Sequence, residues 1–248
     1  MAVQGGIEAG IGPVRLRDAG ETALVVEFGA RVDPDLNARV LALDAALAEA
    51  AVPGLRETVP TYRSLMIHYD PLVLDRADLC RLVEAGVAGA RPRAGGGRRW
   101  TLPCCYDPDL AEDIGTVADW AGLSPAGIAD LHAQAEYRVY MYGFAPGFAY
   151  LGGLPDALAI GRRASPRPPH PANAILIGGG LAAVATVPMP TGWYVVGRTP
   201  ERLFAPARTE NFLIEPGDVL RFAAIDAATF AELDARAARG DIVARRED

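Results

Sequence analysis

Proline and glycine interrupt the second half of this sequence at short intervals, and that punctuation restricts its possible folds. From Ala174 onward, turn-forming residues separate the apolar runs AILI, LAAVATV, WYVVG, RLFAPA and NFLIEPGDVLRF. Short runs of this kind suit strands better than helices. Regularly spaced short strands with such turns predict a β-barrel or a β-sandwich. A helix over residues 227–238 is expected to end the fold.

The segments before these strands predict a separate α+β domain and a linker. Residues 1–90 have the pattern strand, strand, helix, strand, strand, helix, and Asp33 and Asp75 are suited to begin the two helices. Residues 91–98 are rich in Gly, Pro and Arg, which is typical of a linker. Residues 99–248 form the second domain. It is expected to open with a strand over 99–104, helices over 109–120 and 124–133, and a strand over 137–142.

Composition and charge narrow the functional classes. The 248 residues carry a formal net charge of −7, and no stretch gathers basic residues densely enough to bind nucleic acid. No apolar run is long enough to cross a membrane, and the N-terminus lacks the pattern of a secretory signal. Three cysteines, two of them adjacent, provide no disulfide framework. These features predict a cytoplasmic protein with a small-molecule or protein partner.

The basic residues are all arginines: there are 24 of them and no lysine. This excludes a Schiff-base lysine, a P-loop lysine and a lysine general base. Anions would have to be held by arginine, by backbone N–H groups or by a partner chain. Arg162, Arg163, Arg167 and Arg198 lie in turn-rich segments. Rigid neighbours favour Arg167 and Arg198 as preorganised ligand-binding residues or structural clamps.

The histidines do not predict a metal site. His68, His132 and His170 are scattered, and none of them pair at the i, i+4 spacing of helical metal ligands. Residues 178–183 formally fit a dinucleotide fingerprint, but prolines follow too soon for the helix that phosphate binding requires. His132 has two interpretations. It caps the last turn of a helix, or it serves as a general acid or base.

The stretch YMYGFAPGFAYLGGLP, residues 140–155, combines aromatic rings with residues that break regular structure. Glycines allow tight turns, and prolines reduce the entropy lost when the loop becomes ordered. Rings held in this way form a fixed wall. Tyr142, Phe144, Pro146 and Phe148 are therefore expected to form one side of a ligand or partner pocket. The alternative is a structural plug that closes the end of a barrel.

This stretch, followed by RRASPR, GWYVVGRTPERLF and LIEPGDVLRF, resembles allophanate hydrolase subunit 1, which is the B subunit of bacterial 5-oxoprolinase. A sporulation histidine-kinase inhibitor, the Kip protein, belongs to the same family. The resemblance implies an N-terminal ferredoxin-like α+β domain followed by a cyclophilin-like β-barrel domain. It also implies a subunit 2 partner, with ATP used through partner subunits and no cofactor bound by this chain.

One segment departs from the family. Where the family usually has VPAGSVAIAGGQTGIYPxxSPGGW, this chain has HPANAILIGGGLAAVATVPMPTGW. Leu181, Ala182 and Ala183 replace Gln-Thr-Gly, so hydrogen-bonding groups are lost and an apolar lining is expected. The departure argues against oxoproline or allophanate themselves as substrates.

Three hypotheses follow from the sequence. The chain is an accessory subunit of an ATP-dependent amide- or lactam-opening hydrolase, a recruited homologue that guides a cyclisation or isomerisation of a larger metabolite, or a regulator of a histidine kinase. The residues expected to take part in catalysis are His132, Arg167 and Tyr142. Those expected to contact substrate are Phe144, Pro146, Phe148, Leu181, Ala182, Trp193 and Arg198.

Overall fold

The computed structural model describes residues 14–89, 91 and 97–247, which fall into two compact units divided between residues 92 and 93. The predicted linker, residues 91–98, lies mostly outside the described residues, and so does the N-terminal stretch in which no secretory signal is expected.

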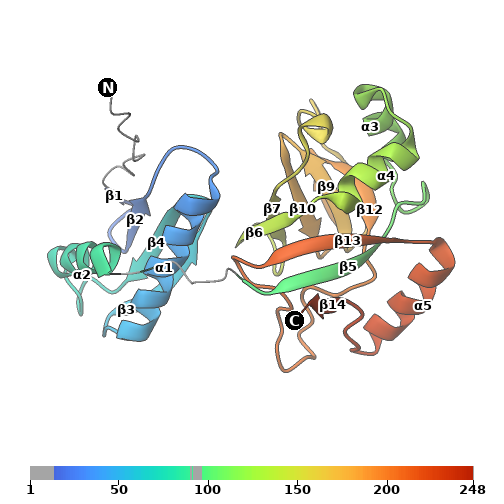
Figure 1. The fold of residues 1–248 in the computed structure, drawn as a ribbon. Coiled ribbons are helices and arrows are strands. Elements are labelled where there is room, and N and C mark those ends of the chain that lie inside the picture. The colour runs from blue at the N-terminus through green and yellow to red at the C-terminus, as the bar shows by residue number, and fades with distance from the viewer. Residues whose placement is uncertain (1–13, 90, 92–96, 248) are drawn as a thin grey trace, which may run out of the picture. The chain divides into compact units, whose positions relative to one another are not determined.

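The first unit is an antiparallel sheet with two helices (Figure 1). Its elements are β1 (Arg15–Asp18), β2 (Ala23–Glu27), α1 (Pro34–Ala50), β3 (Leu55–Pro60), β4 (Ser64–Tyr69) and α2 (Arg76–Gly89). The strand order is β1-β2-β4-β3. Asp33 caps α1 by accepting hydrogen bonds from the N–H groups of Asp35 and Leu36, as its place before Pro34 predicts. One core joins α1, α2 and alternate residues of β2 and β4.

The second unit is built around a closed barrel. Its elements are β5 (Arg99–Cys105), α3 (Ile114–Ala121), α4 (Pro125–Gln134), β6 (Tyr137–Tyr142), β7 (Ala149–Gly152), η1 (Asp156–Leu158), β8 (Arg167–His170), β9 (Ala174–Gly178), β10 (Leu181–Ala185), β11 (Met189–Thr191), β12 (Tyr194–Arg198), β13 (Val219–Ile225), α5 (Ala227–Ala238) and β14 (Arg245–Glu247). The order β12-β9-β10-β7-β6-β13-β5 closes where Arg198 of β12 pairs with Cys105 of β5. The pairing of β13 with β5 is parallel, and the other pairings around the ring are antiparallel.

Alternate residues of the barrel strands belong to two different cores. The first core takes residues from all seven strands of the ring and from α3 and α4, so it fills the barrel interior. In β9, Ile175 and Ile177 belong to it. The neighbours Ala174 and Leu176 belong to a second, outer cluster that includes Met189 of β11 and Trp193. The barrel is therefore packed with side chains on its inside and covered on part of its outside.

Three expected elements differ in the structure. RLFAPA and NFLI do not form regular strands, and a single bridge joins Phe204 to Phe212. Pro206 has no N–H to give to a ladder, and the N–H of Arg202 is bound by the buried Glu201 carboxylate instead. The helix expected from residue 109 begins at Ile114, because turns occupy the preceding residues and Asp113 takes the N-cap position.

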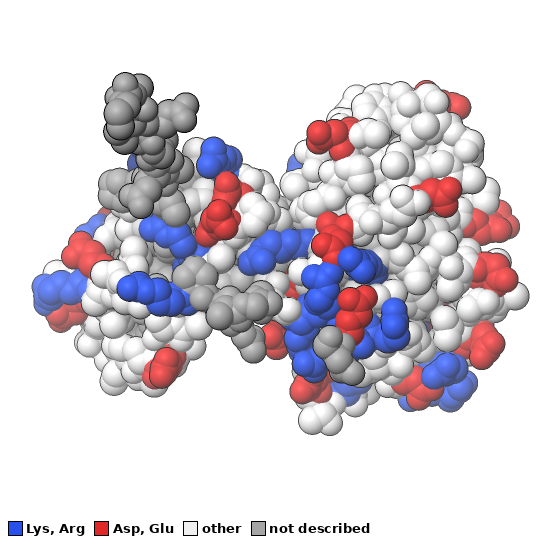
Figure 2. Space-filling view, viewed as in Figure 1, with Lys and Arg blue, Asp and Glu red and all other residues white. Residues whose placement is uncertain are grey.

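Charged side chains pair around the edge of the barrel. Figure 2 shows arginines and acidic residues interspersed on the second unit, below a broad uncharged area. Glu136 pairs with Arg99 of β5 and, at 2.6 Å, with Arg221 of β13. None of the helices in the described part of the chain has the length and apolarity needed to span a bilayer.

Candidate functional site

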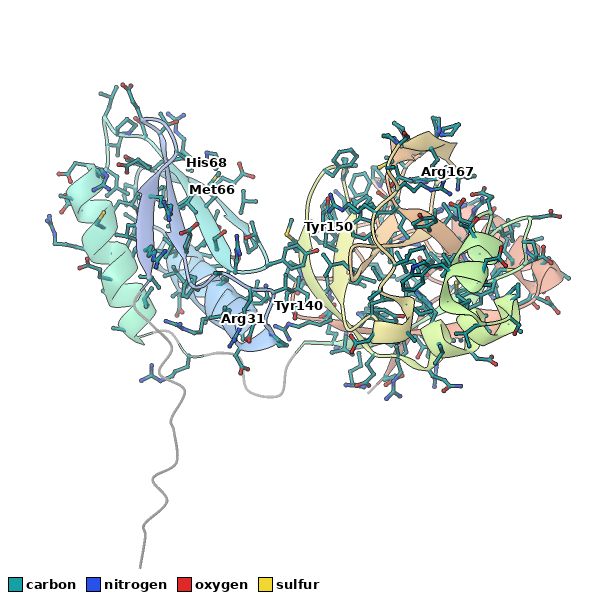
Figure 3. The ribbon with its side chains drawn as sticks, turned by 90° about the horizontal axis from the view of Figure 1, so that it is seen from above. Arg31, Met66, His68, Tyr140, Tyr150 and Arg167 are labelled. Atoms are coloured by element: carbon teal, nitrogen blue, oxygen red, sulfur yellow. The ribbon has the colours of Figure 1, made fainter. Side chains whose placement is uncertain are left out.

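Four aromatic rings form a continuous strip on the outside of the barrel. The ring centroids of Phe144 and Phe148 are 5.9 Å apart, those of Phe148 and Tyr150 are 4.8 Å apart, and those of Tyr150 and Trp193 are 6.3 Å apart. Phe148 and Trp193 are buried in the outer cluster, whereas Phe144 is 78% exposed. The strip thus brings together three residues that the sequence predicted and adds Tyr150 of β7, labelled in Figure 3.

The loop that carries Phe144 is held in a restricted conformation. Phe144 itself has a φ of 66°, in the left-handed region that a non-glycine residue rarely occupies. Gly147 also has positive φ, and a Cβ there would lie 2.5 Å from the Cβ of Phe204. The carbonyl of Pro146 accepts a 2.6 Å hydrogen bond from the Thr186 hydroxyl. These constraints fix an exposed aromatic ring at the surface.

A second feature, which we call the arginine cluster, consists of Glu112, Asp113, Arg163, Arg167 and Arg198. Asp113 accepts from Arg163 at 2.5 Å and from Arg167 at 2.7 Å. Glu112 accepts from Arg167 and Arg198, each at 3.0 Å. Arg167 begins β8 and is labelled in Figure 3. Three of the four predicted arginines therefore do come together, held by two carboxylates that sequence reasoning missed.

Two adjacent arginines, one of them in the cluster, lie over aromatic rings, and the cluster carries excess positive charge. Arg163 lies over the ring of Tyr194 at 4.5 Å, and Arg162 lies over the ring of Trp193 at 5.3 Å. Three guanidinium groups face two carboxylates, so one positive charge remains. Such a cluster attracts an anionic group of a ligand.

Three buried polar atoms around this cluster have no hydrogen-bond partner among the residues that the structure describes. They are Nε of Arg163, Nε of Arg198 and Nε2 of His170. Nδ1 of His170 lies 2.7 Å from the carbonyl of Pro171, and since a carbonyl only accepts, Nδ1 carries the proton and Nε2 is an acceptor. Burial lowers the pKa of His170 and also that of Arg198. The free groups are two donors and one acceptor, which can bind a small polar ligand or water.

His132 does not face the aromatic loop. It is fully buried, its Nδ1 lies 2.8 Å from the Tyr106 hydroxyl, and its ring packs against Phe222 and Tyr137 at centroid distances of 4.8 and 5.0 Å. Burial lowers the pKa of His132 to about 3. The imidazole is a neutral part of the core, so the expectation of a general acid or base at the loop is corrected.

Tyr142 is also engaged structurally. Its hydroxyl donates to the carbonyl of Ile214, and its ring packs against Phe212 at 5.3 Å. Burial raises the pKa of Tyr142. Its proton is therefore held in the protein rather than offered to a ligand.

Leu181 and Ala182 do not line one wall. Ala182 is fully buried in the barrel interior, whereas Leu181 packs against the outer cluster. Adjacent residues of a strand point to opposite faces, so the two replacements cannot share a cavity face. The expected apolar lining made by both residues is corrected.

The buried state of His132 predicts a pH dependence of stability. Its pKa is lower in the folded than in the unfolded chain, so unfolded molecules gain a proton first as pH falls, and stability is lost below about pH 6.5. Between pH 8 and pH 5 this group alone should cost about 2 kcal/mol. In urea unfolding, the native protein should therefore lose about 2 kcal/mol more stability between pH 8 and pH 5 than His132→Leu does. Equal pH dependence in the two proteins would contradict the assignment.

Metal ligands do not gather in the structure. Within residues 14–89, 91 and 97–247 there is no group of three or more His, Cys, Asp or Glu side chains placed to hold a metal ion. Cys80, Cys104 and Cys105 are free thiols, and burial raises the pKa of Cys104 and Cys105.

The sequence resembles known proteins over most of its length. Residues 14–214 match the family described as carboxyltransferase domain, subdomain C and D. The chain is 33% identical to the B subunit of 5-oxoprolinase from Bacillus subtilis (strain 168) over 222 residues, which are 85% of this chain and 92% of that protein. It is 34% identical to the B subunit of 5-oxoprolinase from Escherichia coli O157:H7 over 206 residues, 82% of this chain and 92% of that protein.

Solved structures have the same fold. TTHA0988 is 35% identical with a TM-score of 0.75, and the match covers 86% of this chain but 41% of that chain. PH0987 from Pyrococcus horikoshii is 32% identical with a TM-score of 0.52, covering 87% of this chain and all of that one. The K. lactis urea amidolyase, 16% identical with a TM-score of 0.74 over 94% of this chain and 16% of its own, shares the fold. Because the family match spans most of the sequence, the chain belongs to the carboxyltransferase domain family of subdomains C and D.

Proposed function

We propose that this chain is the B-type subunit of an ATP-dependent hydrolase that opens a small cyclic amide, and that it works with a subunit 2 partner. The observation that carries the proposal is the match to 5-oxoprolinase B subunits over 92% of their length. The chain contains no lysine for a P-loop. ATP would accordingly be bound by partner subunits, in the cytoplasm.

The arginine cluster is the proposed place for the acidic group of the substrate. Its excess positive charge suits a carboxylate, and the unpartnered Nε atoms of Arg163 and Arg198 supply donors beside it. In this proposal Arg167 holds the cluster together through Glu112 and Asp113 rather than transferring protons. Reactive groups for amide opening would come from the partner.

The aromatic strip is the proposed contact with that partner. An exposed phenylalanine on a constrained loop loses little entropy on binding. The match covers 41% of the TTHA0988 chain, so more than half of that chain lies outside the matched part. A second segment of that kind supports the proposal that this chain works with a partner. We also propose that the first unit is ferredoxin-like. Its strand order, β1-β2-β4-β3, is that of ferredoxin-like sheets, except that the edge strand next to β2 comes first in the chain instead of last. The barrel is proposed to be cyclophilin-like.

The activity is tested by reconstitution. Because Leu181 and Ala182 do not form the shared apolar lining that argued against oxoproline, 5-oxoproline is the substrate to test. The chain would be mixed with ATP and 5-oxoproline, alone and with the partner subunits of a 5-oxoprolinase, and released phosphate and glutamate would be measured. Turnover is expected in the complete mixture and in no mixture that omits a component. If the complete mixture releases neither product although the subunits associate, this function is refuted.

The partner contact predicts a large effect of Phe144→Ala. Removing a ring that becomes buried on association costs about 1.5–3 kcal/mol, so the affinity for the subunit 2 partner should fall about 10- to 100-fold. Calorimetric titration measures this. Leu72, which is 95% exposed in the first unit, provides a control, because Leu72→Ala should leave the affinity within about twofold. Equal affinities of the two variants would place the contact elsewhere.

The other two hypotheses have no such support. A recruited enzyme with an enlarged apolar pocket depends on Leu181 and Ala182 sharing a wall, and the two residues lie in different clusters. Kinase regulation is favoured by no particular contact of the described residues.

A further inference from the structure

The first unit contains a hollow of about 460 Å³ that the proposed function does not use. It is lined by Arg15 and Arg17 of β1, by Glu27 at the end of β2, by the turn that follows with Ala30, and by Arg63 just before β4. In Figure 1 this is the region where β1 and β2 adjoin the connection that leads to α1. Three of the lining residues are arginines, in a chain whose net charge is −7.

The positive charges in the hollow are only partly compensated. Glu27 pairs with Arg17 at 2.6 Å. Neither Arg15 nor Arg63 has a carboxylate within ion-pair distance in the part of the chain that the structure describes, and Nη1 of Arg63 donates to the carbonyl of Ala30. Two guanidinium groups therefore face the hollow without an acidic partner among residues 14–89, 91 and 97–247.

A third guanidinium without an ion pair to a described residue lies next to one of the lining residues. Arg39 of α1 lies 5.0 Å from the ring centroid of Phe28, which also lines the hollow. Its Nη1 is buried and has no hydrogen-bond partner. Like the others, Arg39 has no ion pair with a described residue. Arg39 is half-buried, and a guanidinium with a buried, unpaired N–H is stabilised by a nearby anion.

We propose that this hollow binds a small organic dianion, whose acidic groups are carboxylates or a phosphate. The guanidinium fork matches both kinds of oxyanion, and two uncompensated arginines at the hollow suit two negative charges. The volume accommodates a metabolite-sized ligand. This site lies in the first unit and shares no residue with the arginine cluster, so it does not rest on the proposed hydrolase function.

Titration of the full chain tests the site. Inorganic phosphate and glutarate would be titrated separately by calorimetry into the native protein, Arg15→Gln, Arg63→Gln and a control, Arg81→Gln. Arg81 is an exposed arginine of α2 that pairs with Asp78, outside the hollow. Each hollow variant should weaken binding at least tenfold, whereas the control should change it less than twofold. Far-UV circular dichroism confirms that the variants are folded.

A second readout locates the bound anion. In amide-resolved NMR spectra, the backbone N–H signals of Gly29 and Ala30, which line the hollow, should shift on titration of the native protein. Binding of phosphate alone identifies a phosphorylated ligand, and binding of glutarate alone identifies a dicarboxylate. The proposal is overturned if neither anion binds, or if folded Arg15→Gln and Arg63→Gln bind as well as Arg81→Gln.

Discussion

Replacing Asp113 by alanine is expected to lower the free energy of unfolding of the second unit by about 3–5 kcal/mol. The carboxylate is nearly buried and accepts from Arg163, from Arg167 and, at 2.9 Å, from the N–H of Val195 in β12. Its removal takes away the carboxylate that pairs with Arg163, leaves the buried N–H of Val195 without its acceptor, and leaves Arg167 with Glu112 alone. The size of the effect is set by the cost of leaving buried groups unpaired, and not by the net contribution of the intact ion pairs to stability.

Urea unfolding followed by tryptophan fluorescence measures this change, because Trp100, Trp120 and Trp193 all lie in the second unit. The control is Asp109→Ala, an exposed carboxylate four positions earlier, which should change stability by less than about 0.5 kcal/mol. A similar small change for Asp113→Ala would mean that the arginines find other partners. The cluster would then not be a fixed site.

Asp218→Ala is expected to have a comparable effect at the other end of the barrel, again about 3–5 kcal/mol. The Asp218 side chain accepts from the guanidinium of Arg98 at 2.9 and 3.0 Å, from the indole of Trp100 at 3.2 Å and from the N–H of Glu215 at 2.9 Å. It is 2% exposed. One carboxylate thus joins the start of β5 to the turn before β13. Alanine leaves the indole of Trp100 and the N–H of Glu215 without this acceptor, and leaves Arg98 with only the exposed Glu215 carboxylate at 3.7 Å.

Glu215→Ala is the matched control, because Glu215 lies 3.7 Å from the same arginine but its side chain is 63% exposed. An exposed pair contributes about 0–1 kcal/mol, so this variant should unfold close to the native protein. Equal losses of stability in Asp218→Ala and Glu215→Ala would contradict the prediction that burial of the carboxylate sets the size of the effect. Urea midpoints measured at one pH give the comparison directly.

Local patterns determined several elements correctly. Leu36, Val40, Leu43 and Leu47 recur at helical spacing, and all four are buried on α1. The strands over β2, β4, β6 and β9 are expected from short apolar or alternating runs. Phe144, Phe148 and Trp193, all expected from the sequence to contact substrate, belong to one aromatic strip. The expected pocket wall of Tyr142, Phe144, Pro146 and Phe148 stays a prediction. In each case the signal lies in neighbouring residues, whose preferences do not depend on distant partners.

Local patterns failed where both faces of a strand are buried. The run LAAVA of β10 is apolar throughout, so its sequence has no period from which to assign Leu181 outward and Ala182 inward. Which face of β10 points into the barrel is decided only when the seven strands close into the barrel. His132 is a similar case. Its place in the helix suggested a cap of the last turn or a general acid or base facing the loop, whereas packing of α4 against β13 enclosed the imidazole beside Phe222.

The sequence by itself determined the positions of the turns between the strands, the rigid aromatic loop, the absence of lysine and the family. Tertiary structure alone decided the arginine cluster, since Asp113 is 50 residues from Arg163 and Glu112 is 86 residues from Arg198. Carboxylates that pair over such separations leave no local periodicity. Their partners are chosen only when barrel closure brings β8, β12 and the turn before α3 together, because electrostatic attraction acts through space and not along the chain.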